Sequence, residues 1–274
     1  FVVIWDGSPH SPWEAEIGDS APFIHLDPKS RAHYGELVAF DRSVGILRKA
    51  LRDMDAAENT LIWYCSDNGG LPQIEPSTTG GLKGFKGSVW EGGLRVPAII
   101  EWPAQIEARV SAYPASTMDI FPTLVDLLTL PPPARLDPVD GTSIQPVFHQ
   151  EIAEREVSIP FRFRDQGALI DNQYKLVATS IEQQIFELYD LEKDSGESLD
   201  ISITHTDILH EMKRTFMEWN TSVDASIQGR DYPEGKVYED HPREHFWMDD
   251  PRYEPYLDQW VKIPEYESYI LRSR

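Results

Sequence analysis

The sequence predicts an α/β fold, with a mostly parallel sheet flanked by helices over residues 1–155 and a smaller antiparallel α+β subdomain over residues 156–223. Before residue 155, continuous apolar runs that end in polar loops enclose an amphipathic helical pattern, as in the strand–helix–strand units of parallel sheets. After about residue 157, short segments alternate apolar and polar residues, which is typical of half-exposed antiparallel strands. Residues 224–274 are dense in Tyr, Pro, Asp and Glu, and we expect an irregular acidic tail there.

Composition narrows the classes of partner. The 274 residues, 41% of them hydrophobic, are enough to bury a sizeable core. Because 46 acidic residues outnumber 25 basic ones, the net charge of −21 argues against nucleic acid or an anionic membrane surface as the general partner. No uncharged apolar run approaches the ~20 residues that a membrane span needs. With neither an initiator Met nor a signal peptide at its start, we expect the chain to be incomplete at that end.

Three strands and one helix are expected in order along the first 102 residues. Phe1–Trp5 is a continuous apolar run and predicts a buried strand. Residues 33–54 repeat apolar side chains at three- and four-residue spacing, which predicts an amphipathic helix. Residues 61–65 predict a second buried strand, and residues 96–102 predict a third.

A glycine-rich loop and a second helix follow from local composition. Residues 80–93 contain too many glycines for a helix, and we expect a structured loop. Residues 116–128 are amphipathic, with Ser116 or Thr117 as the N-cap, and the prolines at 131–133 should stop the helix. In the second part, short strands are expected at 161–165, 174–179 and 186–189, and a helix at 207–219.

Polar residues of the types found in hydrolytic sites follow the expected strands. Asp67 and Asn68 come directly after the second strand and offer two hard oxygen donors suited to Ca²⁺ or Mg²⁺. His10 follows the first strand and could protonate a leaving group. Lys83 and Lys86 lie in the glycine-rich loop, where cations and exposed N–H groups suit a tetrahedral oxyanion.

Each of these features also has an ordinary structural interpretation. An Asn-Gly pair is a common turn, a loop histidine is more often a surface residue, and loop lysines are usually solvated charges. Together, on one expected edge of the sheet, they indicate a metal site that hydrolyses an anion.

Seven motifs then occur in a fixed order over residues 1 to about 220. The most specific is Lys-Gly-x-x-x-Glu-Gly-Gly-x-Arg-x-Pro at 86–97, following Ser-Asp-Asn-Gly at 66–69. In this order and spacing the chain resembles the sulfatase family of the alkaline-phosphatase-like superfamily. The other motifs are Pro9-His10, Asp41-Arg42-Ser43-Val44-Gly45, Asp119-Ile120-Phe121-Pro122-Thr123-Leu124, Asp140-Gly141-Thr142-Ser143 and Leu188-Tyr189-Asp190-Leu191.

The resemblance implies roles for individual residues. Asp67 and Asn68 match the two later ligands of the family's Ca²⁺, and Lys86 matches the lysine that binds the sulfate oxygens. His10 matches the histidine that contacts the sulfate or the leaving group. Lys83 occupies a variable position and is retained as a candidate substrate contact, whereas Glu91, Gly92, Gly93 and Arg95 are expected to be the scaffold of the loop.

Two parts of the family's apparatus are missing from these residues. The family nucleophile is a formylglycine made from Cys or Ser in a Cys/Ser-x-Pro-x-Arg segment that opens a helix upstream, and an Asp-Asp pair nearer the N-terminus completes the metal shell. Cys65, the one cysteine, lacks the Pro and Arg and is expected to be a buried strand residue. Ser158-Ile159-Pro160-Phe161-Arg162 fits the pattern formally, but it follows the other motifs and should continue as a strand.

By this resemblance, the full-length protein would be a sulfuric ester hydrolase that cleaves sulfate esters of carbohydrates by Ca²⁺-assisted formylglycine chemistry, in the periplasm or outside the cell. The present chain alone is expected to be inactive. A phosphate mono- or diester hydrolase of the same superfamily, with Thr or Ser as nucleophile, is one alternative, and a non-catalytic homologue is another. The gene sequence upstream would distinguish them.

Overall fold

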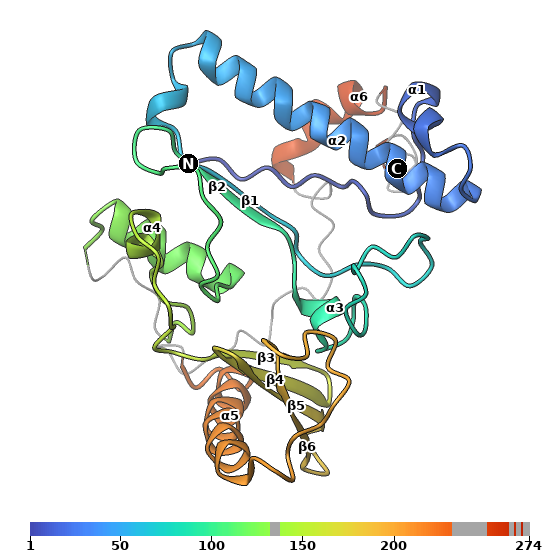
Figure 1. Cartoon of the computed structure of the whole chain (residues 1–274). Helices are drawn as coiled ribbons and strands as arrows, with labels where there is room; N and C mark the ends of the chain where they lie inside the picture. Colours follow the sequence, from blue (N-terminus) through green and yellow to red (C-terminus); the bar gives the residue numbers. More distant parts are fainter. Residues whose placement is uncertain (132–137, 232–250, 263–265, 267–269, 271–274) are drawn as a thin grey trace. The chain divides into compact units, whose positions relative to one another are not determined.

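The computed structural model describes residues 1–131, 138–231, 251–262, 266 and 270 (Figure 1). The chain forms two compact units, Phe1–Val223 and Asp224–Arg274. Among the described residues, no helix combines the length and the apolar character that crossing a membrane requires. The short helical segments of the first unit are α1 (Ile17–Ser20), α3 (Glu91–Leu94) and the 3₁₀ turns at Ala21–Phe23, Ala57–Asn59, Thr117–Asp119 and Gln145–Phe148.

The long helix α2 (Pro28–Asp53) begins five residues earlier than the apolar spacing predicts. Its start is fixed by Asp27, whose carboxylate accepts hydrogen bonds from the backbone N–H groups of Lys29 and Ser30 at 2.9 and 3.2 Å. Pro28, which lacks an N–H group, occupies the first turn, where none is needed. Polar capping therefore extends the helix beyond its amphipathic part.

Strands β1 (Ile62–Cys65) and β2 (Ala98–Glu101) confirm two of the expected strands. They pair antiparallel, with Ile62 opposite Glu101, so the parallel pairing expected over residues 1–155 is not found among the described residues. The buried strand expected at Phe1–Trp5 is wrong for this structure, because these residues are extended coil with side chains 60–94% exposed. A strand needs a neighbour for its backbone hydrogen bonds, and no described strand pairs with this segment. An apolar run alone does not supply that neighbour.

Helix α4 (Ile120–Leu127) is entered through a capping box, which confirms Ser116 as a cap. The Ser116 hydroxyl accepts from the N–H of Met118 at 3.5 Å, and the Asp119 carboxylate accepts from the N–H of Ser116 at 2.8 Å. The same carboxylate forms a fully buried bidentate pair with Arg155 at 2.7 and 2.8 Å. The helix ends at Leu127, before Pro131, and the other two prolines of the expected stop, at 132–133, lie outside the described residues.

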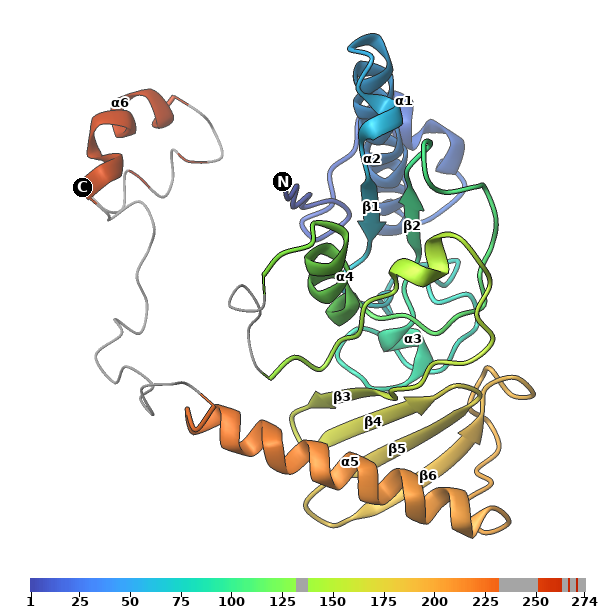
Figure 2. The same ribbon diagram turned by 90° about the vertical axis from the view of Figure 1, so that its left-hand side faces the viewer.

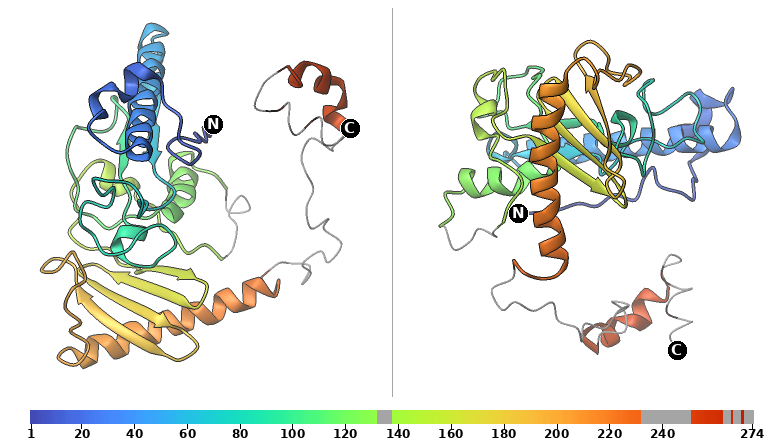
Figure 3. Two further views of the ribbon diagram at one scale, coloured as in Figure 1. Left: turned by 90° about the vertical axis from the view of Figure 1, so that its right-hand side faces the viewer. Right: turned by 90° about the horizontal axis from the view of Figure 1, so that it is seen from below.

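The rest of the first unit is a four-stranded antiparallel sheet with strand order β3-β4-β5-β6, crossed on one face by helix α5 (Thr206–Ile227), as Figures 2 and 3 show. Three strands and the helix confirm the sequence prediction, whereas β4 was missed. Leu169, Leu176, Leu188, Met212 and Phe216 form the core between the sheet and α5. The strands are β3 (Ile159–Phe163), β4 (Gln166–Asp171), β5 (Tyr174–Ser180) and β6 (Ile185–Asp190).

Residues on the opposite face of the same sheet alternate with those under α5. Ala168, Val177 and Tyr189 point away from the helix and enclose Val89 of the glycine-rich loop, which is 1% exposed. In Figure 2, α3 lies over this face of the sheet. The sheet is therefore covered on one side by a helix and on the other by the loop that carries Lys86.

The second unit was expected to be irregular, but its described part contains a 3₁₀ helix at Pro251–Tyr256 and helix α6 (Leu257–Trp260). Aromatic rings hold it together. The ring of Trp260 lies 5.7 Å from those of Tyr253 and Tyr256, and 6.3 Å from that of Tyr266.

Candidate active site

Backbone hydrogen bonds bring the loop after β1 against the glycine-rich loop. The N–H of Lys86 donates to the carbonyl of Gly70 at 2.8 Å, and the N–H of Gly69 donates to the carbonyl of Gly93 at 2.9 Å. The N–H of Ser66 donates to the carbonyl of Pro97 at 3.3 Å. Asp67 and Asn68 lie between these contacts, so the structure places them on the loop that binds the Lys86 backbone.

Glycines allow this approach. A Cβ atom on Gly69 would lie 1.9 Å from the carbonyl oxygen of Gly92, and one on Gly92 would lie 2.2 Å from that of Gly84. Gly84 itself has a φ of +79°, a conformation that other residues rarely adopt. The expected loop is confirmed, although its last residues form the short helix α3.

The side chains after β1 present open oxygen atoms. The Asp67 carboxylate is exposed and makes no hydrogen bond with the described residues. Asn68 donates from Nδ2 to the carbonyl of Gly69 at 3.1 Å, which leaves its Oδ1 available. A carboxylate and an amide oxygen suit Ca²⁺, and their donor chemistry fits the ion. They supply two of the six to eight oxygens that Ca²⁺ takes, and the described residues contain no cluster of three or more His, Cys, Asp or Glu able to hold a metal.

The two candidate lysines lie in different environments. Lys86 is exposed, and its ammonium has no ion pair within the described part of the chain. Lys83 is half-buried, with its Nζ 3.4 Å from the ring centroid of Trp90 and donating to the carbonyl of Glu197 at 3.1 Å. Lys86 is thus available to an anion, whereas Lys83 is engaged within the protein.

His10 lies on a separate segment. Its Nδ1 is 2.8 Å from the carbonyl of Ser11, and the ring is exposed. Helix α2 holds the segment through Glu36, which accepts from the N–H of Glu14 at 2.7 Å. Within the described residues, no hydrogen bond or ion pair joins His10 to Asp67, Asn68 or Lys86. The backbone contacts therefore join the loops of Asp67, Asn68 and Lys86, and they do not include the segment of His10.

Burial also sets the chemistry of Cys65. The thiol is half-buried in β1, and burial followed by the nearby Asp67 carboxylate raises its pKa. A raised pKa keeps the thiol protonated and unreactive. Ser158 precedes β3, which continues as a strand over the Ser-x-Pro-x-Arg match, as expected.

A buried charged network beneath the glycine-rich loop was not predicted from the sequence as a unit. The Lys175 ammonium lies 2.9 Å from Glu91 and 2.8 Å from Glu197, and all three side chains are at most 5% exposed. Glu91 was expected only as scaffold. One sequence feature could have indicated the network. A lysine lies within the apolar strand expected at 174–179, and a lysine is rarely buried unless a charged partner is buried with it.

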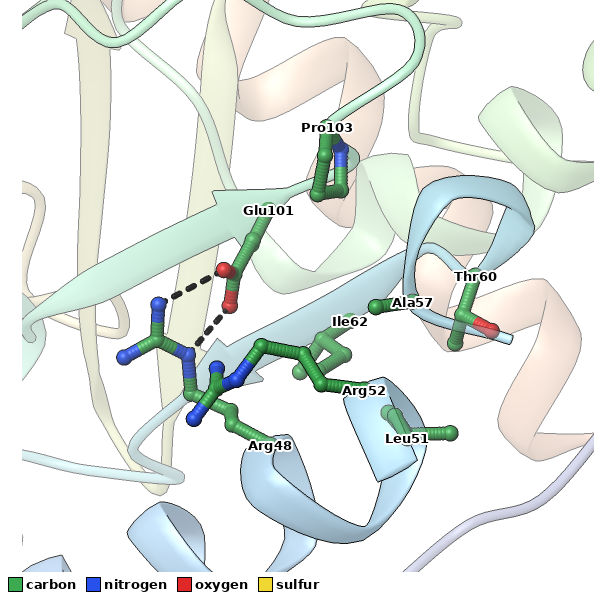
Figure 4. Close-up of a pocket in the computed structure, with 8 residues that line it drawn as sticks. All are labelled: Arg48, Leu51, Arg52, Ala57, Thr60, Ile62, Glu101 and Pro103. Carbon is green, nitrogen blue, oxygen red and sulfur yellow. Dashed lines mark hydrogen bonds and ion pairs between the residues drawn. The ribbon is translucent and has the colours of Figure 1, made fainter. Parts of the chain in front are cut away.

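One surface pocket lies away from these residues. It is formed between the end of α2 and the β1–β2 pair, where Arg48 and Glu101 form a bidentate ion pair with both contacts at 2.7 Å (Figure 4). None of the candidate site residues lines it. We therefore assign no catalytic role to this pocket.

Comparison with known protein families and relatives identifies the family of this chain. Residues 1–130 match the family described as Sulfatase, and residues 85–222 match the one described as N-sulphoglucosamine sulphohydrolase, C-terminal. The chain belongs to the sulfatase family. A sulfatase of Formosa agariphila is 30% identical over 204 residues, covering 64% of this chain and 36% of the relative. An N-acetylgalactosamine-6-sulfatase of Canis lupus familiaris is 38% identical over 137 residues, covering 48% and 26%.

Solved structures share the fold of this chain. The crystal structure of Ps i-CgsB has a TM-score of 0.66 and 33% identity, covering 77% of this chain and 48% of that one. The same protein in complex with k-i-k-neocarrahexaose matches over 96% of this chain and 54% of that one, with 28% identity and a TM-score of 0.66. These likenesses confirm the expected alkaline-phosphatase-like α/β fold. The present sulfatase chain spans about a quarter to just over a third of the length of the curated relatives named above.

Proposed function

We propose that the protein containing this chain hydrolyses sulfate esters of carbohydrates, and that Asp67, Asn68, Lys86 and His10 belong to its active site. The hydrogen bond from the Lys86 backbone N–H to the Gly70 carbonyl supports this proposal, because it joins the loop of the Lys86 cation to the loop of the Asp67 and Asn68 oxygen donors in a sulfatase chain. The N-acetylgalactosamine-6-sulfatase relative and the neocarrahexaose complex support a sulfated sugar as substrate.

Each residue has a role that follows from its chemistry. Asp67 and Asn68 would hold the Ca²⁺, which when bound offsets negative charge on the sulfate oxygens. The Lys86 ammonium pairs with a nonbridging sulfate oxygen as a point charge. His10 is oriented by its Nδ1 contact with the Ser11 carbonyl, which leaves Nε2 of the protonated ring to donate to the departing alcohol oxygen.

We assign no nucleophile among the described residues. Cys65 is a half-buried strand residue with a raised pKa, and the Ser158 match continues as strand β3. We therefore expect no turnover from these 274 residues alone, and we place the formylglycine and the remaining metal ligands outside them. By family resemblance we place the protein in the periplasm or outside the cell, which fractionation of the source cells would test.

Activity of the complete gene product tests the proposal. Lys86→Ala should lower kcat/KM on aryl sulfates and sulfated oligosaccharides by about 10²–10³-fold, because it removes charge stabilisation of the transition state. The control is Lys49→Ala, which changes an exposed helix lysine paired with Asp53. Hydrolysis of phosphate esters instead of sulfate esters would favour the alternative hydrolase, and equal rates for Lys86→Ala and wild type would contradict the assigned role.

Calcium binding is tested separately. Ca²⁺ should raise the melting temperature of the complete protein, and Asp67→Asn should reduce that shift because it removes one charged ligand. Asp53→Asn is the control, since Asp53 is an exposed carboxylate on α2. An unchanged shift in Asp67→Asn would remove Asp67 from the metal site.

A further inference from the structure

The glycine-rich loop packs on the face of the C-terminal sheet that α5 leaves uncovered. Val89 is enclosed by Ala168 and Val177, and the ring of Trp90 lies edge-on to that of Tyr189, with centroids 5.7 Å apart. Segments about 80 to 100 residues apart in the sequence therefore share one core. The loop that carries Lys86 therefore packs directly on the sheet.

Charge adds specific contacts to this packing. Lys175 of β5 is fully buried, and its ammonium contacts Oε1 of Glu91 at 2.9 Å and Oε1 of Glu197 at 2.8 Å. Two buried carboxylates thus share one buried ammonium. Removal of that ammonium would leave two like charges facing each other without water, which is strongly unfavourable.

Glu197 contacts both ends of the segment around Lys86. Its carboxylate accepts from the N–H of Glu91 at 2.7 Å, and its backbone carbonyl accepts from the Lys83 ammonium at 3.1 Å. The two ends are also joined to each other, since the N–H of Gly92 donates to the carbonyl of Lys83 at 2.7 Å. Lys86 lies in the closed segment between these attachment points.

We propose that Glu197 and Lys175 are positioning residues for Lys86, and that they act through Glu91 and Lys83. In this way the C-terminal sheet fixes the position of the Lys86 ammonium that binds the anion. The proposal deepens the sulfatase function above and rests on it for its catalytic meaning. The exposed Lys86 side chain makes no hydrogen bond or ion pair with the described residues, so its position depends on the backbone of its loop. At one end of the loop the Glu91 N–H is bonded to the Glu197 carboxylate, and at the other the Lys83 ammonium is bonded to the Glu197 carbonyl.

Hydrogen exchange of the 274-residue chain tests the positioning role. Lys175→Met removes the ammonium, and Lys175→Met/Glu91→Gln/Glu197→Gln makes the network neutral without leaving buried charges. We expect amide exchange in residues 83–93 to become about tenfold or more faster in both variants. Overall stability should fall in the single variant and largely recover in the triple variant.

The matched control is the other buried ion pair, changed as Arg155→Met/Asp119→Asn. This pair contacts the cap of α4 and the Thr142 backbone rather than the glycine-rich loop. It should lower stability without selectively accelerating exchange at residues 83–93. If the triple variant recovers both stability and loop protection, the network is only structural and the proposal is overturned.

A second measurement uses the complete enzyme. In the triple variant, kcat/KM for a sulfate ester should fall by about tenfold or more, while the Ca²⁺-induced rise in melting temperature stays unchanged. Faster loop exchange with unaltered hydrolysis would overturn the positioning role. A wild-type enzyme that hydrolyses no sulfate ester would refute the proposed function instead, and the exchange experiment would still decide whether the network holds the loop.

Discussion

A single methyl group added at Gly69 should separate the loop after β1, which carries Asp67, from the glycine-rich loop, which carries Lys86. In Gly69→Ala the new Cβ would lie 1.9 Å from the carbonyl oxygen of Gly92, about 1.5 Å closer than the 3.4 Å at which ordinary van der Waals contact begins. The obstructing atom belongs to the backbone and cannot rotate away. The loops that carry Asp67 and Lys86 must therefore move apart by more than 1 Å.

A displacement of that size has a measurable effect on rate and stability. A misplacement of about 1 Å in a catalytic constellation can cost about 10²-fold, so we expect at least that loss in kcat/KM of the complete enzyme on an aryl sulfate. Overpacking should also lower the free energy of unfolding in urea by about 1–3 kcal/mol. The control is Gly45→Ala in α2, where the new Cβ meets no atom within 4 Å and the change should stabilise the helix by about 1 kcal/mol. Equal behaviour of the two variants would refute the close approach of the loops.

Three further outcomes follow from buried groups. Phe216→Ala should lower the free energy of unfolding by about 3–5 kcal/mol in urea titrations, because the fully buried ring fills the core under α5. Arg155→Met should cost about 3–5 kcal/mol by the same measurement, since it leaves Asp119 buried without its partner; a smaller loss in Arg155→Met/Asp119→Asn would support that reason. Burial raises the pKa of Glu197 above its ordinary value of 4.5. As pH rises from 4.5, the folded chain therefore holds this proton more strongly than the unfolded chain does, and the contribution of Glu197 to the free energy of unfolding decreases. The stability of Glu197→Gln relative to wild type should therefore increase as pH rises from 4.5, and a constant difference would contradict the raised pKa.

Elements with strong local signals could be predicted from the sequence. The apolar spacing along α2 and the cap at Ser116 are local features, and both were recovered. Strand β4 was missed because its residues 166–171 include Gly167, which lowers strand propensity although it fits under the ring of Phe216. The apolar run Phe1–Trp5 was assigned wrongly, because apolar character does not specify a hydrogen-bonding neighbour.

The candidate site was predictable where motifs are contiguous and not where distant residues meet. Asp67, Asn68 and Lys86 belong to short motifs, and the structure brings their loops into contact. Lys83 was retained from the sequence as a candidate substrate contact, yet its ammonium is directed to Glu197, 114 residues away. No local pattern encodes such a contact, since it depends on how the sheet folds back under the loop.

Alternate side chains of strand β5 point to opposite faces of the sheet and pack in two different layers. Leu176 and Ala178 belong to the apolar layer beneath α5, whereas Lys175 and Val177 face the glycine-rich loop. Residues one peptide apart are consequently subject to separate constraints during evolution: substitutions at Leu176 must suit a helix, and those at Lys175 or Val177 must suit a loop. Substitutions that suit α5 can therefore accumulate on one face of β5 without changing the residues of the other face that support the glycine-rich loop.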